Sequence, residues 1–147
     1  MDIYLISENK KQFLDLLLLA DEEEHMIDLY LDRGDLFALY DGSLKSICVV
    51  TQEAKNTWEI KNLATYPQYQ GLGYATHLIK YILKYYQREG AVMLVGTGDT
   101  PKTIGFYQKC GFALSHQVNN FFLDHYTKPI IEEGIQLVDM IYLKKAL

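Results

Sequence analysis

The sequence predicts an α+β protein within the broad α/β class. Its sheet is expected to be mixed and mostly antiparallel, with about seven strands and with helices on both faces. Short apolar runs bounded by turn residues indicate strands. Apolar residues spaced three and four apart indicate helices. The two patterns alternate in the second half of the chain, which gives the expected order β-α-α-β-β-β-α-β-α-β-β.

The first half is expected to place two helices ahead of an antiparallel meander. Asp41-Gly42 is typical of a hairpin turn, and Ala54-Lys55-Asn56 indicates a second turn. The helical spacing of leucines and of Met26, Ile27 and Tyr30 predicts two inward-facing helix faces. The predicted elements are strands at 2–6, 35–40, 44–51 and 57–65 and helices at 10–19 and 22–31.

The second half is expected to alternate helices and strands. A long amphipathic helix begins near Gly73 and is predicted to end near Glu89-Gly90, since glycine commonly follows a helix. The turn Gly98-Asp99-Thr100-Pro101 supplies an N-cap and a first-turn proline for a shorter helix. The other predicted elements are a central strand at 91–97, the end of the short helix at Cys110-Gly111, and closing strands at 112–123 and 136–143.

Length and composition narrow the function. The 147 residues, with 49% hydrophobic and 22% charged, fit one globular domain over 1–147. A net charge of −5 argues against nucleic-acid binding. No apolar run has the length of a membrane span, and the first residues lack signal-peptide character, so a cytoplasmic location is expected. Cys48 and Cys110 are expected to be free thiols, and the four scattered histidines do not predict a metal site.

The segment Gln70-Gly71-Leu72-Gly73-Tyr74-Ala75 links a predicted strand to the long helix. A glycine turn at a helix start presents free backbone N–H groups, which can hold phosphate. It lacks the third glycine of a dinucleotide fingerprint and the lysine of an NTPase loop. Taken alone, the segment also fits a turn that simply starts a helix.

Two motifs together resemble the GNAT superfamily of N-acetyltransferases. Gln70 to Ala75 resembles its acyl-CoA motif, [Q/R]-x-x-G-x-[G/A], and follows Asn62-Leu63-Ala64-Thr65-Tyr66-Pro67, which is similar to the preceding strand of that family. Residues 103–112, TIGFYQKCGF, resemble a second motif, A-x-x-[FL]-Y-x-K-x-G-F. One helix and one strand separate the two motifs, and the expected element order matches the family across essentially all 147 residues.

The resemblance implies acetyl-CoA as cosubstrate. It implies a gap between the fourth and fifth strands, where the backbones of Leu63 and Thr65 bind pantetheine. The amides of Gly71, Leu72, Gly73, Tyr74, Ala75 and Thr76 would cradle the pyrophosphate, with Gln70 at the mouth. Many relatives carry arginine where this chain has Gln70, which implies one charge-assisted contact fewer and weaker binding.

The resemblance also implies catalytic roles. Tyr107 occupies the position of the general acid that protonates the departing CoA thiolate. Glu59 is the candidate base by position, and a chain of waters is the alternative. Strand alternation would place Glu59, Lys61, Leu63 and Thr65 on one face of the sheet.

The acceptor side is less defined. The resemblance implies a primary amine of a small molecule or peptide, attacked directly in a ternary complex. Weaker candidates are His125 and Tyr126 in a loop near the acceptor and His25 beside the acidic run 22–24. The connection at 124–136 predicts a functional loop or a homodimer contact. An alternative function is an acyl-CoA-binding sensor or interaction module with little turnover, and the length of the acyl chain is open.

Overall fold

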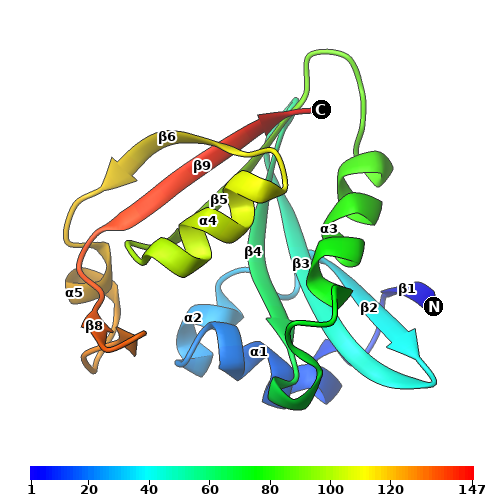
Figure 1. Ribbon diagram of the computed structural model, residues 1–147, viewed down its shortest axis with the longest axis horizontal. Helices are drawn as coiled ribbons and strands as arrows, with labels where there is room; N and C mark the ends of the chain where they lie inside the picture. Colours follow the sequence, from blue (N-terminus) through cyan, green and yellow to red (C-terminus); the bar gives the residue numbers. More distant parts are fainter.

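The computed structural model describes residues 1–147 and contains the expected α+β fold (Figure 1). Seven strands form one sheet in the order β1-β2-β3-β4-β5-β9-β6. Every neighbouring pair is antiparallel except β4 and β5, which are parallel. The strands of the sheet are β1 (Asp2–Ile6), β2 (Asp35–Asp41), β3 (Ser43–Ala54), β4 (Thr57–Thr65), β5 (Val92–Gly98), β6 (Ala113–Val118) and β9 (Met140–Ala146).

Helices cover both faces of this sheet and bury a separate core on each. Leu16, Leu17 and Ile27 pack one core beneath α1 and α2, while Leu78, Ile79 and Ile82 of α3 pack the other with Tyr107 of α4. No helix is long and apolar enough to cross a membrane. The helices are η1 (Lys10–Phe13), α1 (Leu14–Ala20), α2 (Glu24–Asp28), η2 (Pro67–Tyr69), α3 (Tyr74–Tyr85), α4 (Pro101–Lys109) and α5 (Phe121–His125).

The closing strands differ most from the sequence prediction. The predicted strand at 112–123 ends at Val118, because Asn120 adopts a left-handed conformation with φ 58° and begins α5. The predicted strand at 136–143 is displaced to β9. A hairpin precedes it, with β7 (Ile131–Glu132) paired to β8 (Ile135–Gln136) across Glu133-Gly134, both at positive φ. Consecutive positive φ values are typical of a type I′ turn.

The predicted helices are longer than those observed. The region predicted as a helix at 10–19 is split into η1 and α1, and that predicted at 22–31 is reduced to the single turn of α2. Asp21, with an extended φ of −141°, separates α1 from α2. The long helix ends at Tyr85 instead of Glu89, and the next residue, Tyr86, turns into the core against Trp58. The helix therefore ends before the glycine that was expected to stop it.

Candidate active site

The sheet opens between β4 and β5. These strands pair over four residues, the last being Ile60 with Val95, and they share no pair beyond that point. The next residue of β4, Lys61, has no partner on β3 and forms a β-bulge. A bulge bends its strand and increases its twist. The two strands therefore diverge directly after their last pair, as Figure 1 shows.

The bulge makes one expectation wrong. Glu59, Lys61, Leu63 and Thr65 do not share a face, because an extra residue reverses the alternation of side chains. Before the bulge, Trp58 and Ile60 pack in the core under α3; beyond it, Leu63 packs there. Ala64 packs in the core under α1 and α2. Glu59 therefore lies on the face covered by α1 and α2, opposite to Leu63.

A cavity of about 1130 Å³ lies at the opening between β4 and β5. Its walls come from β4, the loop 69–73, the start of α3, β5, α4 and β9. At the other end they come from the segments 19–33 and 121–137. Aromatic side chains line much of it, namely Tyr30, Tyr69, Tyr74, Phe106, Tyr107, Phe121, Phe122, Tyr126 and Tyr142. One cavity therefore joins the glycine loop to both predicted catalytic residues.

The backbone of β4 offers unpaired groups to this cavity. Tyr66 N–H donates to the Lys45 carbonyl on β3 at 3.2 Å. Because N–H directions alternate along a strand, those of Thr65 and Leu63 point away from β3 and into the gap. The Thr65 carbonyl also faces away from β3, since the Gln70 amide donates to it at 3.1 Å. These positions agree with the predicted pantetheine contacts.

The glycine loop is shaped to admit a ligand close to its backbone. Gly71 and Gly73 have φ values of 78° and 89°, which L-residues with a side chain rarely adopt. No atom lies within 4 Å of a Cβ built on either glycine. Gly73 is the N-cap of α3 and provides no side-chain cap, so the first amides of the helix stay free. The loop fits the phosphates of a CoA-type ligand.

The structure brings most of the predicted cofactor residues together. Leu72 is the exception, since its side chain is 65% exposed and does not line the cavity. The residues that line it are Leu63, Thr65, Gln70, Gly71, Gly73, Tyr74, Ala75 and Thr76.

Tyr107 lies on α4 and lines the cavity with only 7% of its surface exposed. Its hydroxyl has no hydrogen-bond partner within the protein. Burial raises the pKa of this phenol well above its usual range, with smaller contributions from Cys48 and Cys110. The hydroxyl therefore remains protonated at neutral pH, as a proton donor must.

Glu59 also lines the cavity and is 6% exposed. Its carboxylate accepts a hydrogen bond from the Tyr142 hydroxyl at 3.2 Å and pairs with the Lys61 ammonium at 2.9 Å. Burial raises the pKa of Tyr142, and the Glu59 carboxylate adds to that shift. Tyr142 and Lys61 therefore both orient the Glu59 carboxylate within the cavity wall.

A buried polar network that was not anticipated from the sequence forms the far end of the cavity. The Asp21 carboxylate accepts hydrogen bonds from Tyr30 at 3.0 Å and from Tyr126 at 2.7 Å. Asn62 donates its amide to the Tyr30 hydroxyl at 3.1 Å and to the Leu17 carbonyl at 3.0 Å. The one sequence feature that could have indicated this network is Asn62, a polar residue in the predicted strand at 57–65.

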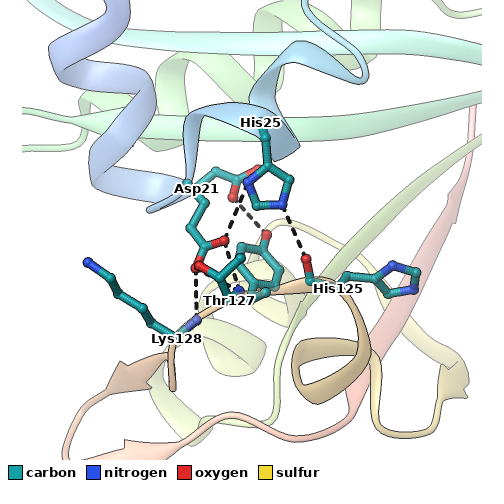
Figure 2. Close-up of polar contacts among 7 residues, drawn as sticks. Asp21, His25, His125, Thr127 and Lys128 are labelled. Carbon is teal, nitrogen blue, oxygen red and sulfur yellow. Dashed lines mark hydrogen bonds and ion pairs between the residues drawn. The ribbon is translucent and has the colours of Figure 1, made fainter.

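A second set of contacts, here called the clasp, joins the segment 21–25 to the segment 125–128 (Figure 2). The Glu23 carboxylate accepts hydrogen bonds from the backbone N–H groups of Thr127 and Lys128 and from the Thr127 hydroxyl. These bonds lower the pKa of Glu23. The His25 ring contacts the His125 carbonyl at 3.3 Å. Glu23 therefore holds residues 125–128 in place beside the far end of the cavity, where the Asp21 network lies.

The weaker candidates have varied surroundings. His25 belongs to the clasp, and the His125 ring lines the cavity and packs on Phe121. His77 is exposed on α3, and His116 stacks on Tyr142. Burial raises the pKa of the Cys48 thiol, which lies in the core. No group of three or more histidine, cysteine, aspartate or glutamate side chains is arranged to hold a metal ion.

Comparison with known proteins identifies the family. A family model described as the acetyltransferase (GNAT) family matches residues 4–112. The chain belongs to this family. It is also 35% identical, over 96% of its length, to the uncharacterized N-acetyltransferase YvbK of Bacillus subtilis, and it covers 93% of that protein. These matches confirm the resemblance on which the expected fold and enzyme class of this GNAT acetyltransferase were based.

Solved structures give the same result. An acetyltransferase of Bacillus subtilis in complex with CoA is 34% identical, with a TM-score of 0.89 and coverage of 99% of this chain and 97% of that one. A GNAT acetyltransferase of Elizabethkingia anophelis with acetyl-CoA bound is 33% identical, with a TM-score of 0.92 and the same coverages. An IAA acetyltransferase of Bacillus cereus is 33% identical, with a TM-score of 0.90 and 99% coverage of both chains.

The glycine loop predicts a specific effect on acetyl-CoA affinity. Gly73→Ala strains a backbone at φ 89° and places a methyl group where phosphate is expected to approach. We expect its Kd for acetyl-CoA to rise by about tenfold, equivalent to about 1.4 kcal/mol, in calorimetric titrations. Gly90→Ala is the matched control, since Gly90 has φ 76° and open space around its Cβ but lies outside the cavity. Equal effects of the two substitutions would contradict a phosphate site at Gly73.

Proposed function

We propose that this acetyltransferase moves an acetyl group from acetyl-CoA to a primary amine of a small molecule or peptide, by direct attack in a ternary complex. One observation carries the proposal. The free backbone of β4, the glycine loop, Tyr107 and Glu59 all line a single cavity that extends onward to the Asp21 network. A cavity that holds both reactants side by side needs no covalent enzyme intermediate, and positioning supplies much of the acceleration.

Backbone groups at one end of the cavity, the donor end, are assigned the binding of acetyl-CoA. The N–H groups of Leu63 and Thr65 would bind the pantetheine amides in the strand gap, as an added strand would. The amides of residues 71–76 would hold the pyrophosphate at the start of α3, where the helix dipole favours negative charge. Gln70 supplies no positive charge, and its amide is bonded to the Thr65 carbonyl.

Tyr107 is the proposed general acid. A thiolate is released as the acetyl group leaves, and a protonated phenol in the cavity wall can donate to it. The absence of a protein partner for the Tyr107 hydroxyl leaves its proton available to the leaving group. Glu59 is the proposed base, since a protonated amine has no lone pair for attack. The alternative is a chain of waters that carries this proton to solvent.

The direct test is acetyl transfer to a panel of amines. We expect CoA thiol release that depends on the amine, together with the N-acetylated amine in the mass spectrum. Tight acetyl-CoA binding without thiol release on any amine would contradict the proposal and favour a sensor or interaction module.

Tyr107→Phe tests the general acid. Removing the proton donor is expected to lower kcat by about 10²-fold while the Kd for acetyl-CoA stays within about twofold of wild type. Because the raised pKa keeps Tyr107 protonated, kcat of the wild type should show no fall with rising pH below about pH 10. Tyr85→Phe, an exposed tyrosine on α3, is the control. An unchanged kcat in Tyr107→Phe would exclude the role.

A further inference from the structure

The end of the cavity formed by the Asp21 network, here called the acceptor end, carries negative charge that no lysine or arginine side chain pairs with. Asp21, Glu132 and Glu133 line this end, and none of them forms an ion pair. Glu132 is partly buried and makes no hydrogen bond through its side chain. Burial raises its pKa, and the neighbouring Glu22 and Glu133 carboxylates add to the shift. Asp21 and Glu132 therefore lack the ion-pair partner that buried anions normally have, while Glu133 is exposed.

Two of the three lysine and arginine side chains in the cavity wall pair with other carboxylates. The Lys61 ammonium pairs with Glu59 at 2.9 Å, and Arg33 pairs with Glu53 at 2.7 Å. Lys102 lies in the first turn of α4, on a different wall from the segment 19–33. Among the groups around Asp21, its hydrogen-bond partners Tyr126 and Tyr30 lower its pKa, His25 lowers it and Glu23 raises it. No lysine or arginine side chain pairs with Asp21, so a ligand can supply the positive charge here.

Asp21 is built to receive such a charge. It is 9% exposed, and its two oxygens are held by the hydroxyls of Tyr30 and Tyr126. A carboxylate has about four acceptor sites, so two remain for N–H donors. Burial raises the pKa of Asp21, since two phenols only partly offset its desolvation. An ammonium group would complete the pairing.

Asn62 gives an independent indication of an N–H donor. The residue is 3% exposed and lines the cavity beside Tyr30, and its Oδ1 atom has no hydrogen-bond partner. A buried carbonyl without a donor costs free energy that a bound ligand can recover. The aromatic rings of Tyr30, Phe122 and Tyr126 line the same end, and their faces attract cations. Carboxylate, carbonyl and aromatic faces together suit an alkylammonium.

We infer that Asp21 binds a second, protonated amine of the acceptor, and that the acceptor class is a linear alkyl diamine or polyamine. This inference rests on the proposed function, since it assigns the first amine to attack at the thioester near Glu59 and Tyr107. Asp21 is not the base. That role is proposed for Glu59, whose carboxylate is held by Tyr142 and Lys61. Asp21 therefore selects and positions the acceptor while the other end reacts.

Equilibrium binding to the CoA complex tests this inference without turnover. The probes are α,ω-diaminoalkanes of three to eight carbons and the monoamines of equal length, titrated by calorimetry. We expect the preferred diamine to bind the wild type about tenfold more tightly than its monoamine, because a charged hydrogen bond is gained. Asp21→Asn should remove this preference and leave the affinity for CoA unchanged. Asp32→Asn, at an exposed aspartate, controls for net charge.

Asp21→Glu keeps the charge and moves it by one methylene, so the preferred diamine should become about one carbon shorter. This variant provides a second readout if Asp21→Asn does not fold. Equal affinities of diamines and monoamines for the wild type would overturn the inference, and so would an Asp21→Asn variant that retains the preference. Binding that follows the prediction without acetyl transfer to any amine would instead count against the proposed function alone.

Discussion

The divergence of β4 from β5 is the constraint on which the rest of the site depends. Two parallel strands that stayed paired would satisfy each other's backbone groups and leave no gap. Here the ladder ends at Ile60, and the bulge at Lys61 bends β4 away. The same bulge turns Glu59 toward α1 and α2, on the face opposite to Leu63. One extra residue thus exposes the donor-binding backbone and aims the candidate base toward the acceptor side.

The acceptor end depends on contacts between distant parts of the chain. Tyr126 and Thr127 reach Asp21 and Glu23 across more than 100 residues of sequence. Glu23 serves as an anchor with its charge satisfied by backbone donors, whereas Asp21 keeps open acceptor sites. Two neighbouring carboxylates therefore have different uses, which their hydrogen-bond partners determine.

Local patterns were enough to propose the donor end, because the chemistry expected there lies in the backbone of one short segment. Gln70 to Ala75 and the 103–112 motif each act within one turn and one helix, so spacing alone locates them. The bulge at Lys61 left no such signal, since it depends on the register with β3. The left-handed Asn120 and the Asp21 network depend likewise on tertiary packing. The sequence pattern predicted a continuous strand through Asn120 and left Asp21 between two predicted helices without a role.

Residue-resolved amide hydrogen exchange with and without CoA tests the central claim most directly. If the gap exposes β4 to the donor, saturating CoA slows exchange at Leu63 and Thr65. Trp58 and Ile60, which already lie within the ladder to β5, should not change. Unchanged exchange at both Leu63 and Thr65, under conditions where calorimetry shows CoA bound, would contradict the account.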